Sequence, residues 1–121
     1  MSTAAVQAAL EAVQAFPGRA GFYWQDLASG EEAEFRGAEP FEAASVIKLP
    51  VLVELFRQLE AGEAREEEPF TIREEEKLPS CGALNYLHTG VTVSLMDLGV
   101  LMVILSDNTA TNVILDTLGL D

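Results

Sequence analysis

Two helical segments that are apolar on almost every face constrain the fold of this chain more than any other feature. The first runs from Val46 to Phe56, where Lys48 and Glu54 interrupt it, and the second runs from Leu95 to Leu105. A helix that is apolar all round is usually buried rather than lying on a surface. Both segments are too short for a membrane span, which needs roughly 20 apolar residues. We therefore expect two helices in the interior of a globular protein.

The rest of the chain predicts a helix, a hairpin and several shorter elements. Residues 3–16 have apolar side chains at helical spacing, and Pro17-Gly18 follows as a stop signal. The aromatic-rich segments 20–28 and 32–36 predict two paired strands joined at Ser29-Gly30. Helices are expected at residues 45–62, 83–88, 95–105 and 109–118, and an extended segment at residues 91–93. Ser94 and Asp97 have the spacing of a capping box before the second apolar helix.

The charge balance limits the partners. Twenty acidic residues against seven basic ones give a formal net charge of −13. Nucleic acids and anionic membranes are bound mainly through Lys and Arg, so we expect neither as a partner. The acidic excess gathers between residues 60 and 77, and we interpret it as a solvated surface. Metal binding by these carboxylates is the alternative, but their spacing gives it little support.

The cysteine and histidine content limits the possible disulfides and metal sites. A single cysteine cannot form an internal disulfide, and a single histidine leaves no plausible zinc set. The N-terminus lacks the basic and apolar regions of a secretion signal, so the expected location is cytoplasmic.

Ser45 and Lys48 stand three residues apart where the first apolar helix begins. Residues at this spacing share a helix face, about 5–6 Å apart at Cβ. A neutral lysine amine can accept a proton from a serine hydroxyl, and apolar neighbours and a helix N-terminus both disfavour the charged amine. The N–H groups of that terminus can also stabilise an oxyanion. The alternative is that Ser45 only caps the helix and Lys48 extends to water.

The tripeptide Ser106-Asp107-Asn108 is the second candidate site, and it lies between two helices. It offers a hydroxyl, a carboxylate and an amide beside an apolar segment. A polar interhelical turn with Ser106 or Asp107 as N-cap would explain one of these residues but not all three. Together with Ser45 and Lys48, the tripeptide favours a catalytic interpretation.

These two motifs carry a resemblance to a known family. Ala44–Lys48 (ASVIK) and Leu105–Asn112 (LSDNTATN) resemble the first two motifs of class A β-lactamases, within the wider family that includes penicillin-binding proteins. The resemblance extends from about residue 21 to residue 118. It implies a mixed α+β fold of the β-lactamase and transpeptidase type.

The resemblance also implies a role for each motif residue. Ser45 would be the acylated nucleophile, with Lys48 as its proton acceptor or relay. Ser106 would pass a proton to the departing lactam nitrogen, and Asn108 would hold Lys48 and the side-chain amide of the substrate. Asp107 would be structural, buried among backbone donors of the turn. No cofactor is implied, because serine acyl transfer needs none.

Two family elements have no counterpart in this sequence. The family has a Lys-Thr-Gly strand and a deacylating glutamate, both after the Ser-Asp-Asn motif. His88-Thr89-Gly90 is the only similar tripeptide, but it precedes Ser106, so we reject it and expect an exposed or capping His88. We therefore expect residues 1–121 to be a partial catalytic domain. Residues 1–44 would begin its α/β subdomain, and residues 45–121 would supply the nucleophile helix and part of the all-α subdomain.

Three functions remain open from the sequence. The first is β-lactam hydrolysis through a serine acyl-enzyme, and the second is a penicillin-binding or esterase-like relative that acylates without fast turnover. The third is a non-catalytic truncated or split fragment, and we expect the chain alone to be inactive. The expected substrate is a small β-lactam or a peptidoglycan-like molecule. A complementary C-terminal half, or a second copy bound through an exposed apolar face, would be the protein partner.

Overall fold

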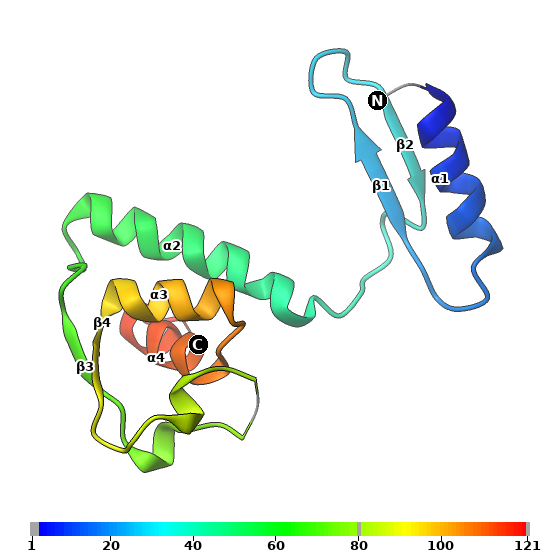
Figure 1. Ribbon diagram of the computed structural model, residues 1–121. Helices are drawn as coiled ribbons and strands as arrows, with labels where there is room; N and C mark the ends of the chain where they lie inside the picture. Colours follow the sequence, from blue (N-terminus) through cyan, green and yellow to red (C-terminus); the bar gives the residue numbers. More distant parts are fainter. Residues whose placement is uncertain (1–2, 80, 121) are drawn as a thin grey trace. The chain divides into compact units, whose positions relative to one another are not determined.

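The computed structural model describes residues 3–79 and 81–120, and it has the mixed α+β fold that the sequence predicts (Figure 1). The chain divides into two compact units. We call Met1–Glu42 the N-unit and Ala43–Asp121 the C-unit. No helix among the described residues is long and apolar enough to cross a membrane.

The N-unit is a helix packed on a hairpin. Helix α1 (Thr3–Ala15) contacts both strands, β1 (Phe22–Gln25) and β2 (Glu32–Phe35), which pair antiparallel. The Asp26 carboxylate accepts hydrogen bonds from the backbone N–H groups of Ala28 and Ser29, each at 2.9 Å, and so closes the turn. The predicted helix and hairpin are confirmed, with strands shorter than the segments predicted for them.

The C-unit holds the remaining elements. Its helices are α2 (Lys48–Ala61), α3 (Leu95–Ile104) and α4 (Asn108–Leu118). Strands β3 (Pro69–Thr71) and β4 (Thr92–Ser94) pair antiparallel. Three single 3₁₀ turns complete it: η1 (Ala44–Ile47), η2 (Glu74–Glu76) and η3 (Leu84–Tyr86). The first apolar helix therefore begins with a 3₁₀ turn, and the short helix expected at residues 83–88 is only the turn η3.

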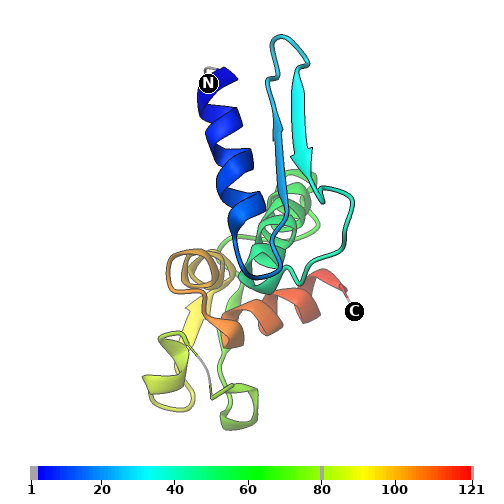
Figure 2. The same cartoon turned by 90° about the vertical axis from the view of Figure 1, so that its right-hand side faces the viewer.

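One apolar core joins the three helices of the C-unit. Helices α2 and α3 lie side by side in opposite directions, and α4 crosses both (Figures 1 and 2). The largest fully buried apolar side chains come from all three helices and from the segments between them: Leu55, Ile72, Leu84, Leu95, Leu98, Met102 and Ile114. Burial of such side chains is the main source of stability in a unit of this size.

The expectation that both apolar helices are buried on every side is wrong for this chain. Helix α2 buries only Lys48, Val51 and Leu55, which share one face, whereas Val53 is 69% exposed. Helix α3 buries four residues, but Ile104 at its end is 67% exposed. The reason is that α2 and α3 each meet the rest of the C-unit on one side, and a helix covered on one side buries one face.

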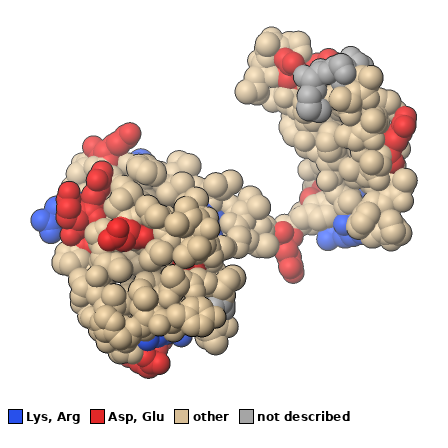
Figure 3. Space-filling view, in the orientation of Figure 1, with Lys and Arg blue, Asp and Glu red and all other residues tan. Residues whose placement is uncertain are grey.

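The acidic residues are placed as the surface interpretation expected. Between residues 60 and 77 most glutamates are exposed, and Figure 3 shows acidic side chains gathered near the C-terminal end of α2. Several of them pair with arginines: Glu63 lies 2.9 Å from Arg57, and Glu76 lies 2.7 Å from Arg73. This surface is solvated and partly neutralised.

Candidate active site

The structure brings together all four residues that the sequence singled out for chemistry. Ser45 Oγ lies 2.7 Å from Ser106 Oγ. Lys48 Nζ donates to Ser106 Oγ at 2.8 Å, to the Ser106 carbonyl at 2.6 Å and to Asn108 Oδ1 at 2.8 Å. These partners are 58 to 61 positions apart in the chain, so the cluster is a product of the tertiary fold.

Two ends of helices supply the cluster. Ser45 lies in η1 and Lys48 is the first residue of α2, so they share one face of this helix end. Ser106 lies in the turn between α3 and α4, and Asn108 is the first residue of α4. The packing of α2 against α3 and α4 therefore positions the serine–lysine pair against the turn.

Strained backbone is concentrated at this site. Ser106 has φ = +54°, and Ala44, directly before Ser45, has φ = +45°. A positive φ is uncommon outside glycine, and such residues gather at functional sites. The Ser106 conformation directs its carbonyl and its hydroxyl toward the same amine, that of Lys48.

Lys48 is 6% exposed, although the apolar neighbours expected to shield it do so only in part. Val51 is buried, but Val46, Ile47 and Leu49 are exposed. The Lys48 amine instead lies against the α3–α4 turn, where three oxygens accept its hydrogen bonds. A buried amine with three acceptors is satisfied, and the alternative that Lys48 extends to water is wrong.

Asp107 has the structural position that the resemblance implied. It is 1% exposed and is the N-cap of α4. One carboxylate oxygen accepts from the backbone N–H of Ala110 at 3.0 Å, and the other accepts from that of Leu84 at 2.9 Å. A Cβ on Gly82 would overlap this carboxylate, so a glycine is required for the close approach. Asp107 thereby joins the α3–α4 turn to the 82–84 segment.

Two buried threonines that the sequence did not single out stabilise the same turn. Thr109 Oγ1 accepts from the backbone N–H of Leu78 at 3.0 Å, and Thr111 Oγ1 donates to the Asp107 carbonyl at 2.7 Å. Both are almost fully buried. The sequence contained one signal that could have identified these threonines. Both lie in the first turn of a helix directly after a candidate site, where hydroxyls bond to backbone groups.

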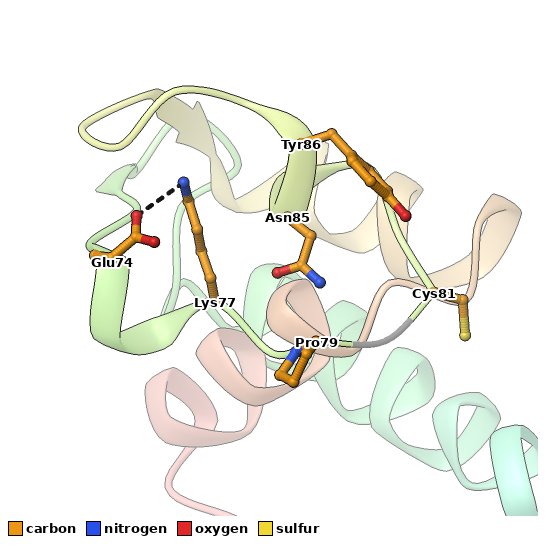
Figure 4. Close-up of a pocket in the computed structure, with 6 residues that line it drawn as sticks. All are labelled: Glu74, Lys77, Pro79, Cys81, Asn85 and Tyr86. Carbon is orange, nitrogen blue, oxygen red and sulfur yellow. Dashed lines mark ion pairs between the residues drawn. The ribbon is translucent and has the colours of Figure 1, made fainter.

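A separate open hollow of about 690 Å³ lies in the C-unit, and none of the four site residues lines it (Figure 4). Its lining residues are Glu74, Lys77, Pro79, Cys81, Asn85 and Tyr86. The Lys77 amine pairs with Glu74 at 3.1 Å and also donates to the Leu87 carbonyl at 2.9 Å. The Thr89 hydroxyl and then Lys77 hold the pKa of Glu74 below its ordinary value. The charged groups of the hollow are thus already engaged with one another.

Two further expectations concern histidine and metals. His88 is exposed, as expected for a residue outside the site. Among the described residues, no group of three His, Cys, Asp or Glu side chains is arranged to hold a metal ion.

The site is a hydrogen-bonded serine–serine–lysine group beside an amide, an arrangement suited to covalent serine catalysis. The chain matches the model of the β-lactamase enzyme family over residues 3–121. The chain therefore belongs to this family, a hydrolase family.

Solved structures agree with this membership. A β-lactamase from Sphaerobacter thermophilus is 36% identical with a TM-score of 0.88, over 100% of this chain and 46% of that protein. PBP-A is also 36% identical, with a TM-score of 0.85, over 97% of this chain and 44% of PBP-A. An ancestral class A β-lactamase of Gram-negative bacteria is 26% identical with a TM-score of 0.83, over 94% of this chain and 44% of that protein. No curated protein sequence matches the chain significantly.

The coverage is one-sided in all three comparisons. Nearly all of this chain is matched, but it spans somewhat less than half the length of each of these relatives.

Proposed function

We propose that Ser45 is the nucleophile of a serine acyl-transfer reaction on β-lactams. The observation that carries the proposal is the hydrogen-bonded series from Ser45 Oγ to Ser106 Oγ at 2.7 Å and from Ser106 Oγ to Lys48 Nζ at 2.8 Å. A serine hydroxyl becomes a strong nucleophile when a neighbouring base can take its proton. A variant of PBP-A has been solved as an acyl-enzyme complex with penicillin G, which supports this substrate class.

Each residue has a defined role in this proposal. Ser45 Oγ attacks the lactam carbonyl carbon, Lys48 accepts the Ser45 proton, and the carbonyl–nitrogen bond breaks. Ser106 protonates the departing nitrogen and regains a proton from Lys48, so the product is an ester of Ser45 with an opened ring. Asn108 keeps Lys48 in place through its Oδ1. Hydrolysis of the ester by water would complete a β-lactamase cycle.

The test is covalent labelling of the protein with penicillin G, followed by intact mass and peptide mapping. We expect an adduct on Ser45 that is lost in Ser45→Ala. Ser29→Ala, which removes an exposed hydroxyl in the hairpin turn, is the matched control and should keep the adduct. An adduct that survives in Ser45→Ala would exclude Ser45 as the nucleophile. The adduct rather than turnover is measured, because the adduct reports attack by Ser45 directly.

The second candidate is a penicillin-binding relative that acylates without fast turnover. The sequence identity to PBP-A supports this candidate, because at 36% it is as high as the identity to the Sphaerobacter β-lactamase. The lifetime of the adduct separates the two candidates. An adduct that persists for hours after removal of free penicillin indicates the penicillin-binding activity, and rapid loss with release of penicilloate indicates a β-lactamase.

A further inference from the structure

Hydrogen bonds join α2 to α4 at two points of the described structure. At the first, where both helices begin, Lys48 Nζ donates to Asn108 Oδ1 at 2.8 Å. At the second, Gln58 Nε2 donates to the carbonyl of Leu118, the last residue of α4, at 3.1 Å. The partners of each bond are 60 positions apart, so the second bond follows the first by the same number of residues along both helices. At 1.5 Å per helical residue, the two points are separated by about 15 Å along each helix.

The Gln58 amide is oriented for this second bond. Its Nε2 also donates to Glu54 Oε1 at 2.9 Å, one helical turn earlier on the same face of α2. Hydrogen bonds from Arg57 and then from Gln58 hold the pKa of Glu54 at about 2, so this carboxylate is ionised at neutral pH and can only accept. An amide nitrogen carries two N–H groups. One of them is therefore directed to Glu54 and the other to Leu118.

Apolar contacts connect α2 and α4 between the two points. Leu55 of α2 and Ile114 of α4 are fully buried in the same core. Hydrophobic contacts are non-directional, so they hold two helices together without selecting one orientation. Hydrogen bonds depend on both distance and angle. The bond from Gln58 is therefore a second fixed point for α4, and without it the helix can shift about the first.

We propose that Gln58 is a positioning residue: its bond to Leu118 fixes α4 against α2 and so keeps Asn108 Oδ1 on the Lys48 amine. This inference rests on the proposed function, in which Asn108 holds Lys48 while Ser45 attacks. Gln58 itself lies about 15 Å from Lys48 along α2 and acts only through α4. Small displacements matter at this site, because a misplacement of about 1 Å in a catalytic arrangement can reduce a rate by as much as 10²-fold.

The test replaces Gln58 by side chains of similar length and measures the rate of Ser45 acylation by penicillin G. Gln58→Met removes the donor, and we expect acylation to slow by about 10-fold or more. Gln58→Lys supplies a donor to Leu118, can pair with Glu54 four residues earlier, and should stay close to the wild-type rate. Gln25→Met is the matched control, because it removes a glutamine–glutamate hydrogen bond in the N-unit, and it should acylate at the wild-type rate.

A spectroscopic measurement separates positioning from simple stabilisation of α4. The side-chain amide of Asn108, assigned by its loss in Asn108→Ala, is followed by ¹H–¹⁵N NMR. We expect its resonances to move in Gln58→Met and to return in Gln58→Lys, because a displacement of α4 reaches its first residue. A side chain that only stabilised the end of α4 would lower the thermal unfolding midpoint and leave the Asn108 resonances unchanged.

The outcomes separate this role from the proposed function. Circular dichroism confirms that each variant is folded, and Gln58→Ala takes the place of Gln58→Met if the latter does not fold. A folded variant without the donor that acylates at the wild-type rate, or that leaves the Asn108 resonances unchanged, would overturn the positioning role and leave the proposed function intact. Equally slow acylation in Gln58→Lys would overturn it too, since the donor would then not be the cause. Wild-type protein without an adduct on Ser45 would overturn the proposed function, and the role of Gln58 in the reaction with it.

Discussion

At the scale of single residues, Asp107 shows how a buried carboxylate is kept in place by backbone alone. Its side chain is 1% exposed, and its two oxygens accept from the N–H groups of Ala110 and Leu84. Hydrogen bonds to a charged group are about twice as strong as neutral ones, so these bonds compensate for desolvation of the charge. Because Asp107 stands between Ser106 and Asn108, the bonds that satisfy it also fix the two neighbours that face Lys48.

Replacing Asp107 should therefore affect stability strongly. Asp107→Ala leaves two buried N–H groups without an acceptor, and we expect a loss of about 2–4 kcal/mol in the free energy of unfolding. Asp107→Asn keeps one oxygen and should fall between Ala and wild type. Urea unfolding measures both, with Asp116→Ala at an exposed position of the same helix as control. A loss in Asp107→Ala no larger than that of the control would contradict this account.

At the scale of elements, α3 begins with a reciprocal cap that the sequence pattern already indicated. Ser94 Oγ accepts from the Asp97 N–H, and Asp97 Oδ2 accepts from the Ser94 N–H, both at 3.0 Å. The hydrogen bond from the Ser94 N–H, followed by that with the Ser94 side chain, lowers the pKa of Asp97 below its ordinary value. The ionised form of Asp97 is thus the form that the folded helix favours.

This lowered pKa predicts a pH dependence of stability. A carboxyl group whose pKa is lower in the folded state stabilises the protein above its unfolded pKa of about 3.9. That contribution is lost as the pH falls through the lower, folded-state value. The difference in unfolding midpoint between wild type and Asp97→Asn should thus be constant near neutral pH and shrink below about pH 4. Thermal unfolding between pH 2 and 7 measures it, with Asp116→Asn as control, and a difference that grows on acidification would disprove the assignment.

At the scale of the whole molecule, the C-unit exposes a large amount of apolar side chain. Val46, Val53 and Leu49 of the η1–α2 segment are 65%, 69% and 57% exposed, and Val103 of α3 is 49% exposed. A shallow groove between α2 and α3 is lined only by apolar residues and glycine: Leu52, Phe56, Met96, Gly99, Val100, Val103 and Ile104. Exposed apolar patches of this kind lead to association in water.

We therefore expect the chain to self-associate as its concentration rises, despite its net charge of −13. Val53→Lys and Val103→Lys together should weaken association, because they interrupt the apolar surface and change stability by no more than about 0.5 kcal/mol each. His88→Lys is the control. It adds a positive charge at an exposed position outside this surface, so it shows the effect of charge without interrupting the apolar surface. Sedimentation velocity over a hundredfold concentration range measures the effect. A wild-type chain that stays monomeric throughout would show that the exposed surface does not drive association.

The local elements could be predicted because their signals are local. The cap at Ser94 and Asp97 depends on residues three apart, and the turn after α1 on Pro17-Gly18. The extent of burial could not be predicted, because an apolar helix is compatible with any number of covered faces. Helix α2 covers Leu55 and leaves Val53 open, and only its neighbours decide which face is covered.

The candidate site, like the fold, could be predicted from the sequence only in part. The sequence by itself determined which residue types are available, namely Ser45, Lys48, Ser106 and Asn108, and which stand at helix ends. The tertiary structure alone decided that Lys48 meets Ser45 through Ser106, because hydrogen bonds between groups 58 to 61 positions apart depend on how α2, α3 and α4 pack. A spacing of three residues places two side chains on one face, but the hydrogen bonds of the Lys48 amine depend on the acceptors that the rest of the fold brings to it.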